Sequence, residues 1–228
     1  MPARSRSRSW VITIDGPAAV GKSTAAKLLA QHLGLAYVDT GATYRALAYA
    51  ALQDGLHPLA DAKRLARIAR RLPLSFHQDA TGGLHITLRG VDITRAIRTE
   101  EMSEAAAQIS QHPLVRAAMV ARQRQLVLQC LTTQRPHVQQ VARVGVVVEG
   151  RDTGSVVFPR AQHKFFLDAK PAVRARRRQR ELLRLYGAGP SVGQVQEQLH
   201  FRDGLDRTRR VGPLVRPRGA QVLETSHC

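Results

Sequence analysis

The sequence of 228 residues has no asparagine, two cysteines and about half as many acidic as basic residues. Cys130 and Cys228 lie far apart and match neither a metal-binding spacing nor the dense disulfide framework of a small secreted protein. No apolar run is long enough to span a membrane, and the basic start of the chain lacks the apolar segment of a signal peptide. We therefore expect a cytoplasmic protein without a membrane partner.

The charge balance is strongly positive, because 35 Lys and Arg residues face 17 Asp and Glu residues for a net charge of +18. Such a charge attracts polyanions, and nucleic acid is one of them. The arginines are nevertheless spread along the chain, and many fall in motifs that suit small phosphates. A protein that handles two nucleotides at once must also offset several negative charges. This distribution favours small anionic substrates and disfavours nucleic acid as a partner.

Short apolar strands alternate with amphipathic helices along the chain, which predicts an α/β fold with a parallel sheet and crossover helices. Hydrophobic residues make up 43% of the chain, enough for a sizeable core. We expect a disordered basic tail over residues 1–9 and a single domain over residues 10–228. The predicted strands are 10–14, 35–38, 144–148, 164–167 and 222–223, and the predicted helices are 22–33, 42–52, 60–72, 100–111, 113–128, 171–186 and 192–201.

One region departs from this alternation. Leu74–His77 and Leu84–Leu88 flank the segment Asp79-Ala80-Thr81-Gly82-Gly83, whose composition is typical of a hairpin loop. A β insertion inside an alternating α/β pattern predicts a small subdomain, which we place at about residues 74–100.

A phosphate-binding loop stands near the start of the chain. The pattern G-x-x-x-x-G-K-[ST] is satisfied by Gly16-Pro17-Ala18-Ala19-Val20-Gly21-Lys22-Ser23. A predicted strand ends just before it and a predicted helix opens at Lys22, so backbone N–H groups and a helix N-terminus can cradle phosphates. We expect Gly16 to Thr24 to bind ATP, with Lys22 reaching the β- and γ-phosphates and the Ser23 hydroxyl binding Mg²⁺.

The absence of asparagine narrows the class of this P-loop protein. GTPases read guanine through the motif Asn-Lys-x-Asp, which this chain lacks. Large motor-type ATPases need a longer chain. A small kinase remains, together with a nucleotide-binding module that carries no activity.

The segment after the second predicted strand is the first candidate for binding an acceptor. It reads Asp39-Thr40-Gly41-Ala42-Thr43-Tyr44-Arg45, which we expect to be a turn over 39–41 followed by a helix. Ligands of doubly wound sheets sit beyond the carboxyl ends of the strands, so Thr40 and Arg45 should lie beside the phosphate loop. Arg45 could grip a phosphate through two hydrogen bonds. A capping turn with an exposed arginine fits the same residues.

A charged cluster, Glu149-Gly150-Arg151-Asp152, follows the apolar strand Val144–Val148. Packing of the strand in the core does not require charged residues at its end, so it explains this cluster poorly. Arg151 suits an anionic acceptor, and Asp152 can accept a hydrogen bond from the amino group of a base. Either Glu149 or Asp152 could hold Mg²⁺ through water, since no other predicted strand ends in a clear acidic ligand.

The helix over 171–186 is strongly basic, and Gly187–Pro190 interrupts the chain after it. A solvated helix face and a lid that closes over a triphosphate both fit this density of charge. Its arginines are Arg174, Arg176, Arg177, Arg178 and Arg180.

A last charged segment, Arg202 to Arg209, follows the predicted helix 192–201. Its alternating signs fit exposed salt bridges of little energetic value. They equally fit a site in which Asp206 holds ribose hydroxyls while Arg202 and Arg209 hold phosphates.

Taken together, these segments resemble the bacterial cytidylate kinase family. The matches run in order over nearly the whole chain, and the pair Gly-Ala-x-Tyr-Arg and Gly-Arg-Asp-x-Gly is far more specific than the phosphate loop. The matching segments are Ile14-Asp15-Gly16-Pro17, Asp39-Thr40-Gly41-Ala42-Thr43-Tyr44-Arg45, Ile97-Arg98-Thr99-Glu100-Glu101, Glu149-Gly150-Arg151-Asp152-Thr153-Gly154, Phe165-Phe166-Leu167-Asp168-Ala169, and Asp203-x-x-Asp206-x-x-Arg209 with Pro213-Leu214.

The resemblance implies a P-loop NTPase-type parallel sheet flanked by helices, a β-containing acceptor-binding insertion and a helical lid at about 171–190. It implies the transfer of a phosphoryl group from ATP to CMP or dCMP with Mg²⁺, and we expect a monomer. Arg116 and Asp152 would face the cytosine, and Asp206 the ribose. Lys22, Arg45, Arg151 and, in the lid, Arg177 are the expected catalytic groups. The implied acceptor contacts are Thr40, Arg45, Arg116, Arg151, Asp152, Arg202, Asp206 and Arg209.

Two features depart from the family pattern. Ala107 stands where the family usually has a hydroxyl residue near the base, and Ser103 or Ser110 lies one turn away and could substitute. The chain also stops at Cys228, where the family continues into a final helix, so we expect a core face to be less covered. The rival functions are a kinase of another small acceptor, such as UMP or shikimate, and a nucleic-acid-associated ATP-binding protein.

Overall fold

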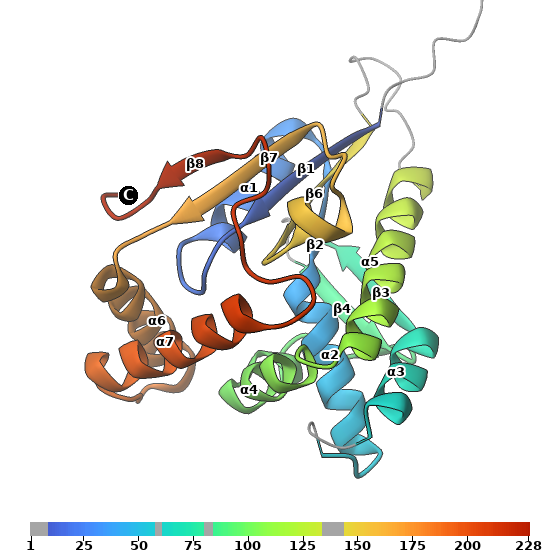
Figure 1. Ribbon diagram of the computed structural model, residues 1–228, viewed down its shortest axis with the longest axis horizontal. Helices are drawn as coiled ribbons and strands as arrows, with labels where there is room; N and C mark the ends of the chain where they lie inside the picture. Colours follow the sequence, from blue (N-terminus) through green and yellow to red (C-terminus); the bar gives the residue numbers. More distant parts are fainter. Residues whose placement is uncertain (1–8, 58–60, 80–83, 134–143) are drawn as a thin grey trace, which may run out of the picture.

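The computed structural model describes residues 9–57, 61–79, 84–133 and 144–228 (Figure 1). Most of the predicted tail, residues 1–8, lies outside the described residues, as do the hairpin segment 80–83 and residue 60 of a predicted helix. No helix in the described ranges combines the length and apolarity needed to cross a bilayer.

A parallel sheet of five strands, in the order β2-β6-β1-β7-β8, forms the centre of the fold. Its middle is strongly apolar, and Val146, Val147 and Val148 of β6 are fully buried. This confirms all five predicted strands. Each continues one or two residues past its predicted end, whereas β2 and β6 begin one residue later than predicted. The strands are β1 (Trp10–Asp15), β2 (Ala36–Asp39), β6 (Gly145–Gly150), β7 (His163–Asp168) and β8 (Gln221–Glu224).

Seven α-helices are described, together with two short helical turns, and they occupy every predicted helical region. The helices are α1 (Lys22–Leu33), α2 (Thr40–Gln53), α3 (Ala62–Arg71), α4 (Glu100–Ile109), α5 (Pro113–Thr133), α6 (Pro171–Tyr186) and α7 (Val192–Thr208), and the turns are η1 (Ala96–Arg98) and η2 (Thr153–Val157).

Two predicted boundaries are wrong in a way that bears on function. The predicted turn at 39–41 is helical from Thr40 onward, because the Asp39 side chain accepts from the Ala42 N–H and caps α2. The helix predicted to end at residue 201 continues to Thr208, because Asp203 and Asp206 are buried on one face of α7. Arg202 and Asp206 therefore project from a helix and not from a loop.

The predicted β insertion is present as a separate antiparallel sheet, β3-β4-β5, formed by β3 (Leu74–Gln78), β4 (Leu84–Leu88) and β5 (Val91–Asp92). The sequence did not indicate β5, because two residues are too few to show an alternating pattern. Leu74, Ile86 and Leu88 are buried and belong to the same apolar core as the central sheet. The insertion is thus packed onto the main body of the protein.

Helices α6 and α7 pack against each other and lie to one side of the molecule, where α7 also contacts α4 (Figure 1). They have their own small apolar cluster, in which Ala175 and Leu182 of α6 meet Val195 and Leu199 of α7. Ala18 of the phosphate loop belongs to the same cluster, so α6 and α7 contact the loop directly. Beside them, β8 forms an edge of the sheet with its four residues exposed.

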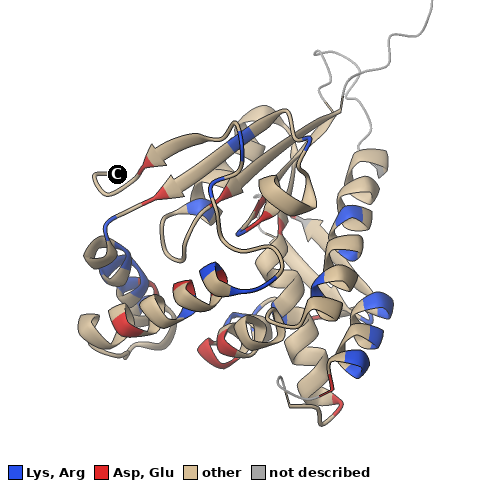
Figure 2. Cartoon of the chain, in the orientation of Figure 1, with Lys and Arg blue, Asp and Glu red and all other residues tan. Residues whose placement is uncertain are grey.

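The basic residues occur on many elements, including α3, α5 and α6, and are not confined to one of them (Figure 2).

Candidate active site

The phosphate loop joins β1 to α1 and closes tightly against β7. Gly16 has φ +148°, and a Cβ at this position would lie 2.1 Å from the Leu167 carbonyl oxygen, so only glycine fits. Lys22 is buried, and its Nζ donates to the Pro17 carbonyl oxygen at 2.6 Å. Burial, followed by the nearby Arg151 guanidinium, lowers the pKa of Lys22 to about 7. The loop thus holds a cation that gains stabilisation when a phosphate arrives.

Ser23, the hydroxyl residue of the loop, lies beside a buried carboxylate. Its Oγ donates to Glu149 Oε2 at 3.0 Å, and the Tyr37 hydroxyl donates to Glu149 Oε1. Burial raises the pKa of Glu149, and the nearby Asp39 adds to this rise. Mg²⁺ prefers oxygen ligands, and here a hydroxyl oxygen and a carboxylate oxygen lie side by side, so these residues fit the expected metal.

The structure favours Glu149 over Asp152 as the acidic residue nearest to Ser23, because Asp152 is engaged elsewhere by two arginines. The partner Tyr37 was not anticipated from the sequence. A tyrosine in a short strand gives no sequence signal of a polar role.

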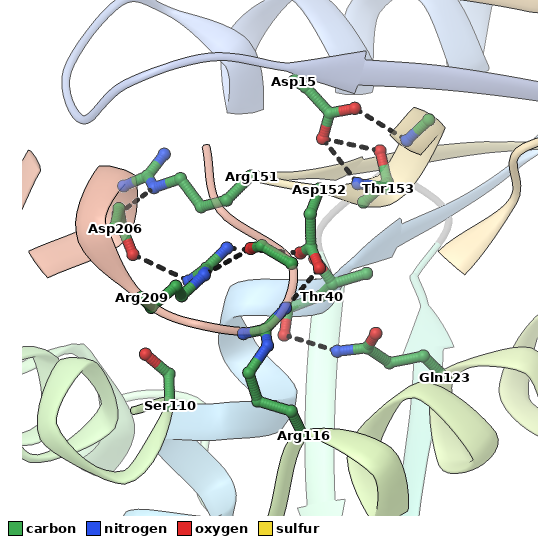
Figure 3. Close-up of polar contacts among 12 residues, drawn as sticks. Asp15, Thr40, Ser110, Arg116, Gln123, Arg151, Asp152, Thr153, Asp206 and Arg209 are labelled. Carbon is green, nitrogen blue, oxygen red and sulfur yellow. Dashed lines mark hydrogen bonds and ion pairs between the residues drawn. The ribbon is translucent and has the colours of Figure 1, made fainter. Parts of the chain in front are cut away.

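Five side chains form a buried ionic cluster, shown in Figure 3, which we call the acceptor cluster. Arg116 pairs with Asp152 Oδ2, and Arg209 Nη2 lies 3.5 Å from Asp152 Oδ1. Arg209 Nη1 also lies 2.9 Å from Asp206 Oδ1, while Arg151 Nε lies 2.8 Å from Asp206 Oδ2. The members of the acceptor cluster are Arg116, Arg151, Asp152, Asp206 and Arg209.

The acceptor cluster connects directly to the phosphate loop through Arg151. Its Nη1 donates to the Gly16 carbonyl oxygen at 2.8 Å, while its Nε is paired with Asp206. The cluster is assembled from α5, the segment after β6, and α7 with the residue that follows it. Helix and loop segments more than 90 residues apart in sequence therefore meet beside the phosphate loop.

Charge in the acceptor cluster is buried but paired. Arg116 is 1% exposed, and Asp206 and Arg209 are also buried. Burial opposes ionisation of Asp206, yet the Arg151, Arg209 and Arg202 guanidinium groups together lower its pKa. Carboxylates held by several arginines stay charged at neutral pH and fix the arginines in return.

The acceptor cluster also has unused hydrogen-bonding capacity. Among the described residues, Arg116 Nε and Nη1 and the Tyr44 hydroxyl are buried without a hydrogen-bond partner. The Arg116 guanidinium lies over the Tyr44 ring at 5.8 Å from its centroid. Buried donors without partners are costly, so they indicate a place for a polar ligand.

The other predicted acceptor residues lie on the borders of this cluster. Thr40 Oγ1 donates to the Glu149 carbonyl oxygen at 2.7 Å, and Arg45 Nη2 lies 2.7 Å from Asp39 Oδ2. Burial lowers the pKa of Arg202 to about 10, and the positive charges of Arg151 and Arg45 add to this shift. The positive charges of Arg45, Arg151 and Arg202 repel one another, and a bound anion would relieve this repulsion.

The five predicted lid arginines of α6 lie in four different environments. Arg174 pairs with Asp203 of α7 and donates to the Ala18 carbonyl oxygen at 3.2 Å, which ties it to the phosphate loop. Arg178 pairs with Glu100 of α4. Arg177 donates to the carbonyl oxygens of Thr225 and Cys228, so the structure does not bring this predicted catalytic residue to the acceptor cluster. Arg176 and Arg180 are exposed.

The position that lacks the family's usual hydroxyl is buried on α4. Ala107 is 9% exposed, and its carbonyl oxygen accepts from Ser110 Oγ at 2.7 Å. Ser103 and Ser110 are both buried on the same helix. Ser110 lies on the side of α4 that faces the acceptor cluster in Figure 3.

Comparison with known proteins agrees with this geometry. The sequence model of the family described as cytidylate kinase matches residues 12–228. A cytidylate kinase from Pelotomaculum thermopropionicum is 41% identical over 94% of this chain and 88% of its own length. One from Solibacter usitatus is 41% identical over 98% and 88%. A bifunctional pantoate ligase/cytidylate kinase from Trichodesmium erythraeum is 37% identical over 96% of this chain and 38% of its own length. This chain therefore belongs to the cytidylate kinase family.

Proposed function

We propose that this protein transfers the γ-phosphoryl group of ATP to CMP or dCMP, giving ADP and CDP or dCDP. The observation that carries the proposal is Arg151, which bonds to the phosphate loop at Gly16 and to the acceptor cluster at Asp206. A donor site and an acceptor site that share one arginine suit direct transfer between two bound nucleotides. Membership of the cytidylate kinase family supports the same reaction.

The donor would bind along Gly16 to Thr24, with its phosphates on the backbone N–H groups and on Lys22. When bound, Mg²⁺ would offset part of the negative charge of the phosphates. We assign its direct contact to Ser23 and a water-mediated contact to Glu149, which hydrogen-bond to each other.

The acceptor would bind over the acceptor cluster. Asp152 would accept from the exocyclic amino group of cytosine, and Arg116 would donate to the ring through its unpartnered nitrogens. Asp206 would hold the ribose together with Arg209. Arg45, Arg151 and Arg202 would hold the phosphate, and the Thr40 hydroxyl would border it. The present ion pairs would exchange partners as the nucleotide enters.

The acceptor needs no general base, because a nucleotide phosphate has a second pKa of about 6 and is mostly dianionic at neutral pH. A phosphate oxygen of CMP attacks the γ-phosphorus, and the bond from that phosphorus to the bridging oxygen of ADP breaks. Lys22, Arg45 and Arg151 would offset the charge that spreads over the transferred group.

We assign the lid to residues 171–190 and the acceptor-binding insertion to residues 74–100. Lid closure would exclude water from the transfer and suppress ATP hydrolysis. Arg177 can take part in catalysis only if closure releases its bonds to Thr225 and Cys228. The monomeric state and the cytoplasmic location stay predictions.

The direct test is ADP formation from Mg-ATP with CMP, dCMP, UMP, AMP and shikimate in parallel. CMP and dCMP well ahead of the other acceptors would support the proposal and would show that Ala107 is tolerated. UMP equal to CMP would keep the kinase and reject cytosine readout by Arg116 and Asp152. ATP binding without transfer to any acceptor would reject the enzyme in favour of a nucleotide-binding module.

A further inference from the structure

Asp15 is the last residue of β1 and stands immediately before the phosphate loop. Its carboxylate is fully buried. All three of its hydrogen bonds come from one segment of chain. Asp15 Oδ1 accepts from the Thr153 N–H and from Thr153 Oγ1, both at 2.8 Å, and Oδ2 accepts from the Gly154 N–H at 2.7 Å. Figure 3 shows the carboxylate of Asp15 facing this segment.

Stability alone is a poor explanation for this carboxylate. Asp15 forms no ion pair with any residue that the structure describes. Burying a charge without a cation is costly, and hydrogen bonds from three donors only offset part of that cost. The buried carboxylate of Asp15 is explained if the function of the protein requires the backbone geometry that it imposes on Thr153 and Gly154.

The two residues directly before Thr153 are among those that the proposed function places against the acceptor nucleotide. Arg151 contacts the phosphate loop and Asp206, and Asp152 pairs with Arg116 and Arg209. Because Asp15 holds the next two residues, it fixes the end of the Arg151–Asp152 segment.

The other end of that segment is fixed as well. Gly150 is the register partner of Asp15 in the parallel pair of β1 and β6. A Cβ at Gly150 would come within 2.3 Å of Thr40 Oγ1, which itself donates to the Glu149 carbonyl oxygen. Arg151 and Asp152 are thus held from both sides, with α2 before them and Asp15 after them.

We propose that Asp15 is a positioning residue for the acceptor nucleotide: by clamping Thr153 and Gly154 it sets the direction of Asp152 and Arg151, and so determines cytosine selection and acceptor alignment without touching either nucleotide. The proposal rests on the proposed function. It also explains how the phosphate loop and the acceptor cluster keep a constant spacing, because Asp15 and Gly16 are adjacent in the chain and each bonds to one part of the segment after β6.

The test variant is Asp15→Asn, which keeps the shape of the side chain. Its amide carbonyl can still accept from Thr153, but its NH₂ group would face the Gly154 N–H as a second donor. We expect the KM for CMP to rise about 10- to 100-fold, by analogy with the loss of a group that orients a ligand-binding side chain. We expect the ratio of kcat/KM for CMP over UMP to fall, and the Kd for Mg-ATP to stay unchanged.

A matched pair at Thr153 separates the hydrogen bond from the packing. Thr153→Val removes the hydroxyl bond to Asp15 at nearly constant shape and keeps the bond from the Thr153 N–H, so the KM for CMP should rise by a smaller factor. Thr153→Ser keeps the hydroxyl and should behave like the parent protein. If Asp15→Asn does not fold, the Thr153 pair decides the question alone.

The outcomes of this experiment separate the two proposals. A parent protein that does not phosphorylate CMP rejects the proposed function itself. An active parent protein whose Asp15→Asn or Thr153→Val variant loses thermal stability, with the KM for CMP and the CMP/UMP ratio unchanged, rejects the positioning role. Equal losses in affinity for ATP and CMP would reject it too, because a general distortion of the site would then be the cause.

Discussion

The two halves of the site handle phosphate charge in opposite ways. The donor half is one continuous loop that offers backbone N–H groups and the buried side chain of Lys22, whose pKa burial lowers to about 7. The acceptor half is assembled from distant segments, and its arginines are already paired with Asp152 and Asp206. Among the described residues Lys22 therefore has no ion pair, whereas the arginines of the acceptor half are already paired with carboxylates.

The two halves of the site therefore change their ion pairs differently when a nucleotide binds. A triphosphate entering the donor half adds a partner for Lys22 and displaces only its bond to the Pro17 carbonyl oxygen. A nucleotide entering the acceptor half must replace existing ion pairs, and it gains affinity only if its own groups match them in geometry. Because its ion pairs must be replaced with matching geometry, the acceptor half is suited to discriminate between similar nucleotides. The donor half only gains a charged partner, which suits binding of any nucleoside triphosphate.

The largest expected effect comes from removing the donor cation. Lys22→Ala should lower kcat by about 10³-fold or more, because the charge that develops on the transferred group loses its closest side-chain partner. The fold should survive, since among the described residues the Lys22 side chain hydrogen-bonds to the Pro17 carbonyl oxygen alone. The measurement is steady-state ADP formation together with a circular dichroism spectrum. Near-normal turnover in a folded variant would contradict the assignment of the donor half.

The next largest effect comes from breaking the acceptor half. Asp152→Ala leaves Arg116 and Arg209 buried without their shared carboxylate, which should lower the free energy of unfolding by about 3 kcal/mol. Urea unfolding of the parent and the variant measures this difference. Ser155→Ala, a change of a buried hydroxyl without a hydrogen-bond partner among the described residues, provides a control of similar location. Equal losses in both variants would mean that the charge pairing contributes nothing special.

A third prediction uses the titration of Lys22. Its pKa of about 7 in this structure means that about one tenth of the lysine is protonated at pH 8. Bound phosphates favour the charged form, so ATP binding at pH 8 should take up close to one proton at Lys22, and binding at pH 6 only about one tenth of a proton. Calorimetry in buffers of different ionisation enthalpy measures this uptake. Uptake that persists in Lys22→Met would show that another group is responsible.

The smallest effect is expected where the lid meets the acceptor half. Glu100→Gln should remove the ion pair with Arg178, which also pairs with Glu181 at 2.8 Å. Because the Glu100 side chain is 36% exposed, solvent screens the pair, and the free energy of unfolding should fall by less than about 1 kcal/mol. Urea unfolding again provides the value. A loss as large as that of Asp152→Ala would mean that the lid contact, and not the acceptor cluster, stabilises this region.

The same contrast explains what the sequence could reveal. The phosphate loop was predicted residue by residue, because its function follows from local backbone geometry over eight consecutive positions. The sheet was predicted because its strands are short apolar runs. Arg116 is different, since it lies in a helix of 21 residues that contains further arginines, and only the resemblance to a family singled it out.

Other features of the acceptor half depend on tertiary contacts that no local pattern shows. The extension of α7 past residue 201 brings Asp203 to Arg174 and Asp206 to Arg151, and the alternating charges of this segment resembled a loop. Likewise the hydrogen bonds between Asp15 and Thr153 join residues 138 positions apart, so no local pattern around Asp15 indicates them.

The most direct test of cytosine readout by the acceptor cluster is the ratio of kcat/KM for CMP over UMP in the parent protein and in Asp152→Asn. The side-chain amide can donate to the uracil carbonyl oxygen, whereas the carboxylate can only accept from the cytosine amino group. We predict a parent protein that strongly prefers CMP and a variant whose preference falls by about 10-fold or more. An unchanged ratio in an active variant would contradict base recognition by Asp152 and, with it, the proposed role of the acceptor cluster.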